Sequence, residues 1–313
     1  MEAAKIREGD SVVRKSYGSD LIFQVMCVDC DGPGEPRARL KGLNVRLVAD
    51  APVSDLELAD ERAVIELRRE TMRQSAELVR AARMRMQQEE QARSKKERRR
   101  SVFGLARALG AAATADDRFS LPGKVLHIDG DADYLRDCMR YYKDLGVPAV
   151  GKHIKPEHQA DAVENLLAEV SPDVLVLTGH DALKRKGSDR AMMSSYWNSE
   201  HYVNAVRRAR RYENDLDGLV IVAGACQSFY EALIEAGANF ASAPERVLIH
   251  CMDPVLIAER IVNTPVDEMV LADQAVDGTI TKRPGMGGVQ TRGKMRVSIP
   301  RTALGVNGAG RAR

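Results

Sequence analysis

Two stretches of the sequence end a hydrophobic run with a side chain that can do covalent or proton-transfer chemistry. Residues 174–180 spell Val-Leu-Val-Leu-Thr-Gly-His, and residues 219–226 spell Leu-Val-Ile-Val-Ala-Gly-Ala-Cys. A continuous aliphatic run of this length predicts a strand that is buried on both faces of a sheet. The carboxyl ends of parallel strands face a common crevice, so His180 and Cys226 are expected to meet there. A thiol beside an imidazole is what a cysteine nucleophile and its base require, and a hydrolase is therefore the first hypothesis.

Cys226 is expected at the turn from the second of these strands into a helix over residues 228–236. Free backbone N–H groups and the dipole at a helix start would lower the pKa of the thiol and hold an oxyanion. We therefore expect Cys226 to be the nucleophile and His180 to give a proton to the leaving group. His250, at the end of a further expected strand over residues 246–251, is a reserve base. Residues that flank the pair are expected at the oxyanion and the substrate: Gly179, Asp181, Ala225 and Gln227.

The composition restricts the class of protein. The 313 residues are 44% hydrophobic and 29% charged, and the net charge of +2 argues against a general nucleic-acid or membrane binder. No apolar stretch approaches the length of a membrane span, and the first ten residues lack the apolar segment of a secretion signal. Five cysteines at irregular spacing favour reduced thiols in a cytoplasm over a disulfide framework. Cys27 and Cys30 form a single CxxC without a second pair, so no metal or cofactor is predicted.

The first part of the chain, residues 1–52, is expected to be a small β unit. Its β-rich runs are separated by Gly, Pro and Asp turns, and they cover residues 10–17, 21–28, 37–40 and 44–48. This pattern fits a small barrel of the SH3-like kind. Such modules usually bind partners or regulate an attached domain.

Residues 53–117 are expected to form one long charged helix and then an exposed linker. Ser54 can cap the helix start, with Glu57 completing a capping box. An apolar residue recurs at every seventh position, but the companion positions are too polar for a good coiled-coil seam. We expect a mostly solvated helix that lies against another part of the protein, with an oligomer formed through this helix as the alternative. The three arginines at 98–100 are a hypothetical self-cleavage site in the linker.

From residue 118 to residue 270 the sequence alternates strands and helices. Expected strands cover residues 124–128, 147–150, 173–178, 218–223 and 246–251, and expected helices cover 131–145, 156–170, 200–212, 228–236 and 254–262. This order predicts an α/β domain with a mostly parallel sheet and helices on both faces. The remaining residues, 271–313, are expected to form a β or loop extension.

A set of short motifs carries a resemblance to a known family. The motifs are 14–17 (Arg-Lys-Ser-Tyr), 122–131 (Pro-Gly-Lys-Val-Leu-His-Ile-Asp-Gly-Asp), 178–182 (Thr-Gly-His-Asp-Ala), 223–228 (Ala-Gly-Ala-Cys-Gln-Ser), 236–242 (Ala-Gly-Ala-Asn-Phe-Ala-Ser), 287–288 (Gly-Gly) and 291–293 (Thr-Arg-Gly). Together they resemble the YabG sporulation-specific protease family. More broadly, the spacing of His and Cys resembles clan CD cysteine peptidases, which include caspases, clostripain and gingipains. The resemblance covers the N-terminal unit and the α/β part, but not the helical segment between them.

This resemblance implies a caspase-like fold and a cysteine endopeptidase with its catalytic pair at His180 and Cys226. It also implies a protease of spore-forming bacteria that trims spore coat and morphogenetic proteins and cuts after arginine. Such an enzyme acts on protein substrates, in the cytoplasm of the mother cell or at the spore coat. A buried substrate guanidinium needs a carboxylate, and Asp129, Asp181 and Asp253 all remain open for that role.

Clan CD peptidases carry a glycine directly after the histidine, whereas here Gly179 precedes His180 and Asp181 follows it. The second oxyanion donor is therefore not assigned by the resemblance. Two other interpretations are a non-catalytic doubly wound binding or signalling domain and a structural spore coat protein. A receiver domain would have an acceptor aspartate where the third strand ends at Thr178, and an intact His180 and Cys226 argue against a purely structural protein.

Overall fold

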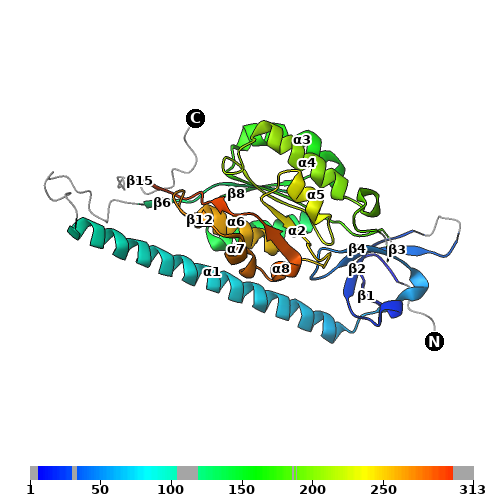
Figure 1. Ribbon diagram of the computed structural model, residues 1–313. Coiled ribbons are helices and arrows are strands. Elements are labelled where there is room, and N and C mark those ends of the chain that lie inside the picture. Colours follow the sequence, from blue (N-terminus) through cyan, green and yellow to red (C-terminus); the bar gives the residue numbers. More distant parts are fainter. Residues whose placement is uncertain (1–5, 30–33, 104–118, 185–186, 188, 299–313) are drawn as a thin grey trace.

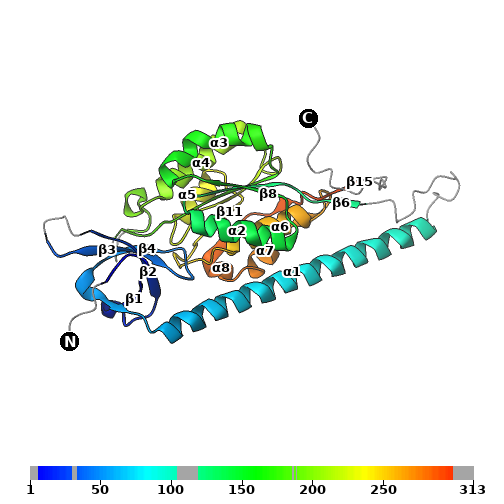
Figure 2. The ribbon, with the colours of Figure 1, turned by 180° about the vertical axis from the view of Figure 1, so that it is seen from behind.

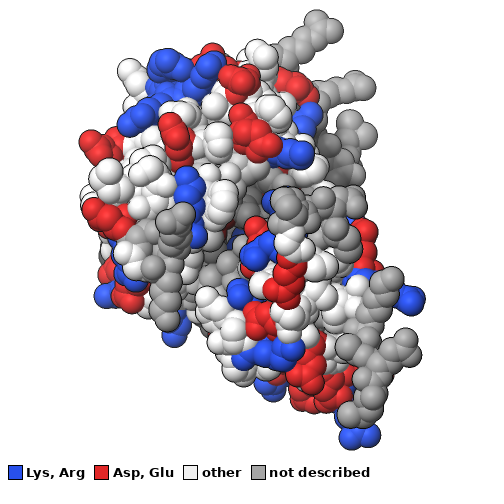
Figure 3. All heavy atoms as spheres, turned by 90° about the vertical axis from the view of Figure 1, so that its right-hand side faces the viewer, with Lys and Arg blue, Asp and Glu red and all other residues white. Residues whose placement is uncertain are grey.

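Short apolar runs near the N-terminus form a five-stranded antiparallel sheet, which a long helix links to a larger α/β part (Figure 1). This computed structural model describes residues 6–29, 34–103, 119–184, 187 and 189–298. The strands, in spatial order, are β4 (Val48–Pro52), β3 (Arg37–Gly42), β2 (Ile22–Asp29), β1 (Ser11–Arg14) and β5 (Leu56–Leu58). Val12, Phe23 and Leu40 belong to a small hydrophobic core within this sheet. Basic and acidic side chains are interspersed over this side of the molecule (Figure 3).

The fourth strand of this β unit differs from the expectation, since β4 starts only at the last residue of the expected run 44–48. Residues 43–47 form a tight loop, closed by a 2.8 Å hydrogen bond from the Gly42 N–H to the Leu47 carbonyl. The hydroxyl of Tyr134, from the α/β part, donates to the carbonyls of Gly42 at 2.8 Å and Val45 at 2.6 Å. Two carbonyls are thus satisfied without a strand partner, which stabilises the loop.

The capping box expected at Ser54 and Glu57 is wrong. Residues Val53–Asp55 form a single 3-10 turn, and Glu57 lies in β5, opposite Val13 of β1. Leu56 enters the core of the β unit, and this burial outweighs the local preference for a helix start. A second 3-10 turn covers Lys15–Tyr17.

Helix α1 (Glu61–Phe103) runs along one side of the molecule, past α2, α6 and α7 (Figures 1 and 2). Ser75 and Ala82 are buried against the α/β part, and the Tyr141 hydroxyl donates to the Ser75 Oγ at 3.0 Å. The apolar seventh positions form only part of the packed face, because Ile65 and Met72 are exposed whereas Val79 lies against the core of the α/β part. The helix is mostly solvated and lies against the α/β part, as expected, and it continues through the three arginines at 98–100, whose side chains lie outside the described residues.

The α/β part is built on a six-stranded sheet. In spatial order its strands are β13 (Met286–Gly288), β11 (Phe240–Ser242), β10 (Val220–Ala223), β9 (Val174–Thr178), β7 (Val125–Asp129) and β8 (Ala149–His153). All neighbours are parallel except β13, which is antiparallel to β11. In β7 and β9 successive residues point to opposite faces, so one aliphatic run fills two hydrophobic cores.

Helices cover both faces of this sheet, which confirms the predicted α/β class. Helices α2 (Ala132–Leu145) and α6 (Asp253–Asn263) pack on one face together with α1. On the other face lie α3 (Pro156–Val170), α4 (Ser199–Tyr212) and α5 (Tyr230–Glu235). The remaining elements are η5 (Met193–Ser195), α7 (Ala272–Asp277), α8 (Lys282–Gly285) and the strand pairs β12 (Met269–Val270) with β14 (Thr291–Arg292) and β6 (Phe119–Leu121) with β15 (Arg296–Ser298).

The strand that follows β10 in the sequence is not the expected one. It is β11, of only three residues, whereas the expected strand over residues 246–251 is irregular. This segment crosses the end of the sheet, where the carbonyl of Val247 accepts from the Gln227 N–H at 3.0 Å. Its aliphatic residues therefore pack against the turn that follows β10 instead of extending the sheet.

Two ion pairs attach helix α1 to α6, and in one of them the carboxylate is fully buried. The carboxylate of Glu259 is fully buried and pairs with Arg85 of α1, while Glu89 pairs with Arg260 at 2.6 Å. We expect Arg85→Ala to lower the free energy of unfolding by about 1–3 kcal/mol, because it leaves a buried carboxylate without its charged partner. The control, Arg73→Ala, removes an exposed pair with Glu70 on the same helix and should cause a smaller loss in urea denaturation.

Candidate active site

The chain turns back at the centre of the sheet. From β7 it crosses to β8 on one side and then to β9 on the other, so the connections diverge at the carboxyl ends of β7 and β9, the position at which sheets of this kind commonly bind ligands. Asp129 ends β7 and lies opposite Thr178 of β9. His180 follows β9 and Cys226 follows the neighbouring strand β10. The expected residues therefore follow adjacent strands at the same edge of the sheet.

The imidazole of His180 is oriented by a carboxylate and its backbone is fixed by two side chains. Its Nε2 lies 2.9 Å from Asp131 Oδ2, and its ring is 5.6 Å from that of Tyr134. The His180 carbonyl accepts hydrogen bonds from the Asn198 amide at 2.8 Å and the Tyr202 hydroxyl at 3.1 Å. Within the described part of the chain, the buried Nδ1 has no hydrogen-bond partner. When Asp131 holds the proton of Nε2, Nδ1 is the ring atom free to take up or give a proton.

Asp131 contacts His180, and the sequence did not assign it a role. It caps α2 by accepting from the N–H groups of Asp133 at 2.9 Å and Tyr134 at 3.0 Å, and it pairs with Lys41 Nζ at 2.8 Å. Burial raises the pKa of Asp131, but hydrogen bonds from His180 and Lys41 outweigh that effect and leave the pKa well below its usual range. The carboxylate is therefore ionised. The feature of the sequence that could have indicated Asp131 was the acidic turn directly after β7.

Gly179 allows the end of β9 to pass close to the turn after β7. A Cβ atom at this position would lie 2.6 Å from the Tyr202 hydroxyl and 3.1 Å from the Gly130 nitrogen. Any side chain there would push His180 away from Asp131. The glycine expected at the substrate thus also has a steric role in positioning the imidazole.

The thiol of Cys226 is buried and protonated in this arrangement. Its Sγ accepts a hydrogen bond from the Ile249 N–H at 3.2 Å. Burial raises the pKa of the thiol to about 12, although the hydrogen bond from the Ile249 N–H and the charge of Arg46 lower it in part. The expectation of a lowered thiol pKa is wrong for this arrangement, because α5 begins only at Tyr230, four residues later, and the thiol is shielded from water.

Asp181 ties the loop of His180 to the turn of Cys226. Its carboxylate accepts hydrogen bonds from the N–H groups of Ala182 at 2.9 Å and Asn198 at 2.8 Å, and from the hydroxyls of Ser199 and Ser228. The Ser228 hydroxyl in turn accepts from the Ala225 N–H at 2.9 Å. Burial raises the pKa of Asp181, and these neutral donors offset that only in part.

Gln227 completes the turn. Its backbone has a φ of 56°, the left-handed region that few residues other than glycine adopt, and its side-chain carbonyl accepts from the Leu183 N–H at 3.3 Å. The strained turn places Cys226 between the end of β10 and the irregular segment that carries Ile249. Strain of this kind persists where surrounding contacts hold it, as the contacts of Asp181 and Gln227 do here.

The other two residues expected near the crevice have their polar atoms engaged locally. His250 Nδ1 accepts from the Met252 N–H at 3.1 Å, and burial lowers the pKa of this imidazole. Asp253 accepts from the His250 N–H at 3.0 Å, the Ile280 N–H at 2.7 Å and the Thr281 hydroxyl at 2.5 Å. His250 does not end a strand, so its expected position at a strand end is wrong.

A second His and Cys lie close together behind the crevice. His127, Asp129 and Cys138 offer atoms within 4.8 Å of one another, a spacing that a metal ion could use. The guanidinium of Arg46 already fills this place, with its Nη2 2.7 Å from Asp129 and 3.3 Å from the Cys138 sulfur. Both ring nitrogens of His127 face hydroxyl groups, and burial raises the pKa of the Cys138 thiol. This cluster binds a cationic side chain, which leaves no anionic site for a metal.

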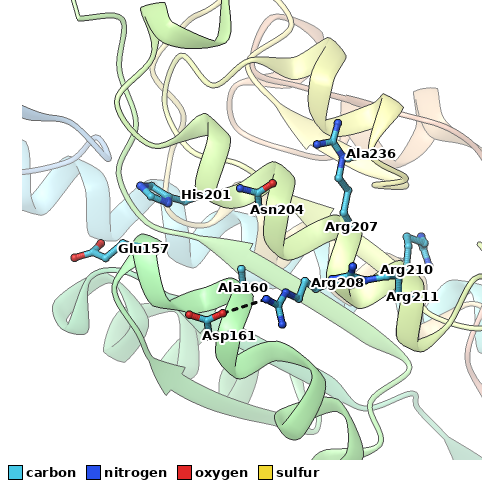
Figure 4. Close-up of a pocket in the computed structure, with 10 residues that line it drawn as sticks. All are labelled: Glu157, Ala160, Asp161, His201, Asn204, Arg207, Arg208, Arg210, Arg211 and Ala236. Atoms are coloured by element: carbon cyan, nitrogen blue, oxygen red, sulfur yellow. Dashed lines mark ion pairs between the residues drawn. The ribbon is translucent and has the colours of Figure 1, made fainter.

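A shallow pocket lies elsewhere, between α3 and α4 (Figure 4). Arg207, Arg208 and Arg211 line it from α4, with Glu157 and Asp161 from α3. The Arg208 guanidinium lies 3.3 Å from the Asp161 carboxylate. The pocket contains none of the described partners of His180 and Cys226, and its mixed charges are typical of a solvated helix face.

Comparison with known proteins identifies the family. The family model described as YabG peptidase U57 matches residues 7–300. The chain belongs to this YabG peptidase family. It is also 39% identical over 302 residues to the sporulation-specific protease YabG of Bacillus subtilis (strain 168), covering 93% of this chain and 97% of that protein.

Among solved structures, the chain is similar to the isolated REC domain of RcsB from Salmonella enterica serovar Typhimurium. The two are 15% identical, the match covers 44% of this chain and 87% of that chain, and the TM-score is 0.29. In the described part of this chain, moreover, no helix has the length and apolar character to cross a membrane.

The burial of the thiols predicts their reactivity. In the native protein we expect iodoacetamide to label Cys27, which is exposed, much faster than Cys226 or Cys138. Because burial raises the pKa of Cys226 to about 12, its labelling rate should rise about tenfold per pH unit between pH 8 and pH 10. Mass spectrometry of tryptic peptides measures both rates, and fast labelling of Cys226 with a plateau below pH 9 would contradict a shielded thiol.

Proposed function

We propose that the chain is a cysteine endopeptidase in which Cys226 is the nucleophile and His180 the general acid and base. The observation that carries this proposal is a histidine oriented by Asp131, with a free Nδ1, on the strand adjacent to that of the cysteine. Membership of a peptidase family supports proteolysis over a non-catalytic signalling domain or a structural coat protein. The same proposal includes a caspase-like arrangement of the parallel strands and an SH3-like form of the β unit.

The proposed chemistry gives each of these groups one role. The Cys226 thiol gives its proton to His180 Nδ1 as the sulfur attacks the scissile carbonyl, forming an S–C bond and an oxyanion. The N–H of Cys226 holds the oxyanion, together with the N–H of Gly179 or Asp181. The imidazolium, stabilised by Asp131, then protonates the leaving amine as the C–N bond breaks. Water, deprotonated by the same imidazole, hydrolyses the thioester and restores the thiol.

The substrates proposed for this enzyme are spore coat and morphogenetic proteins, cut after arginine. This assignment is supported by the 39% identity to a protein named as a sporulation-specific protease. It places the enzyme in the mother cell of a sporulating bacterium, in the cytoplasm or at the spore coat.

Cys226→Ala and His180→Ala should each lower kcat on an arginine-containing peptide by about 10³-fold or more, because each removes a group that takes part in bond making. His153→Ala is the matched control, since His153 is exposed at the end of β8. The assay is release of a fluorophore from the peptide, with circular dichroism to verify the fold. Near-normal cleavage by Cys226→Ala would end the cysteine-peptidase assignment, and an inactive His250→Ala beside an active His180→Ala would move the base to His250.

Asp131→Asn should lower kcat by about 10²-fold or more with a smaller effect on KM, because a neutral amide no longer holds the proton on Nε2 or stabilises the imidazolium. The control is Asp133→Asn, which removes the other carboxylate that pairs with Lys41 and is mostly exposed. Equal kcat values for the two variants would show that Asp131 serves only to cap α2.

A further inference from the structure

The loop at residues 43–47 of the β unit brings a charged side chain into the catalytic edge of the sheet. Arg46 is fully buried, and its Nη2 lies 2.7 Å from Asp129 Oδ2, which is also fully buried. The ring of Tyr134 covers the guanidinium at 5.0 Å and also contacts His180. The side chain of an arginine from the β unit therefore pairs with Asp129, the last residue of β7.

Asp129 is a fixed and ionised carboxylate that suits a cationic partner. Its carboxylate is fixed by the Asp131 N–H at 2.9 Å and the Thr178 hydroxyl at 3.0 Å, and His127 Nε2 lies 3.4 Å away. Burial raises the pKa of Asp129, but the charge of Arg46 and the contact with His127 keep the pKa far below its usual range. By contrast, the carboxylates of Asp181 and Asp253 accept several hydrogen bonds from neutral groups, and no guanidinium of the described residues lies against either.

The backbone of Arg46 lies beside the nucleophile. Its N–H faces the Ile249 carbonyl at 3.4 Å, and the N–H of Ile249 is the group that contacts Cys226 Sγ. The residue thus has its side chain at the carboxylate and its main chain beside Ile249, whose N–H contacts the sulfur. This placement resembles that of the arginine before a scissile bond.

The loop does not have the extended backbone that a bound substrate would adopt. The Leu47 N–H donates to the Val45 carbonyl at 2.8 Å, which closes a three-residue turn centred on Arg46 instead of an extended strand. Among the described residues, the Nε and Nη1 atoms of Arg46 have no hydrogen-bond partner. Buried donors without partners weaken the contact, as expected for an occupant that has to leave.

We propose that the pocket at Asp129 receives the arginine of protein substrates, and that Arg46 is an internal occupant that must withdraw before a substrate binds. This inference rests on the proposed peptidase function and names its specificity residue. Lys41, from the strand that leads into the loop, pairs with Asp131 at 2.8 Å and so contacts the carboxylate that orients His180. Withdrawal of the loop uncovers the guanidinium pocket and leaves Asp129 free to pair with the arginine of a substrate.

The specificity part is tested with peptides that differ only in arginine or citrulline, which has the same shape without the charge. Wild-type enzyme should prefer arginine in kcat/KM by about 30-fold or more, and Asp129→Asn should lose this preference. A preference that survives in Asp129→Asn would overturn the assignment of the pocket while leaving the peptidase function intact.

The occupancy part is tested with Arg46→Ala and Arg46→Gln in the full chain, with Arg39→Ala, an exposed arginine of β3, as the control. Either Arg46 variant should raise kcat/KM by about tenfold or more and speed iodoacetamide labelling of Cys226, while Arg39→Ala changes neither. N-acetyl-arginine amide, but not its citrulline analogue, should slow the labelling again and raise Tm.

These two readouts separate the possible failures. Faster labelling that arginine amide reverses, without cleavage of any peptide, would support the pocket and refute the peptidase function. Arg46 variants that fold, cleave at the wild-type rate and label as slowly as wild type would show that Arg46 is only a structural link. If both variants fail to fold, the comparison of arginine and citrulline peptides in Asp129→Asn still decides whether Asp129 receives the arginine of the substrate.

Discussion

The buried ion pair between Asp129 and Arg46 is the contact on which the arrangement of the site depends. A carboxylate and a guanidinium that are both shielded from water are each costly alone, so each needs a partner of opposite charge to stay buried. Asp129 belongs to the centre of the parallel sheet and Arg46 to the N-terminal β unit. One pair therefore joins two parts of the chain that each have a core of their own. The same guanidinium lies over the ring of Tyr134, and that ring in turn contacts the imidazole of His180.

Two neighbouring carboxylates show how the kind of donor decides a charge state. Asp131 receives hydrogen bonds from an imidazole and an ammonium group, and its pKa is lowered. Asp181 receives them only from backbone amides and hydroxyls, and burial raises its pKa. The first is suited to stabilising a histidine that becomes charged, and the second to holding two loops together. Sequence position alone does not separate these roles, since both acids lie two or three residues after the end of a strand, β7 for Asp131 and β9 for Asp181.

Much of the fold could be predicted because the central strands are long aliphatic runs. β7, β9 and β10 all lie where the sequence places them, and so do His180 and Cys226 at their ends. The same signal failed at residues 44–48 and 246–251, which are as apolar as strands but find their partners in other parts of the chain. β11 was missed because three residues are too few to show a period. Asp131 and Arg46 could not be assigned, since each acts through a contact that is distant in sequence.

Helix α1 keeps the loop at residues 43–47 close to the site. The helix is held against the α/β part from Ser75 to Glu89 and begins directly after the last strand of the β unit. A loop that leaves the crevice therefore stays tethered within reach of it, at an effective concentration that short connections commonly place in the millimolar range. Any arginine side chain from outside must compete against that local concentration. A substrate can do so by adding contacts along its chain, which a free amino acid cannot, so the tether itself would favour proteins over small ligands.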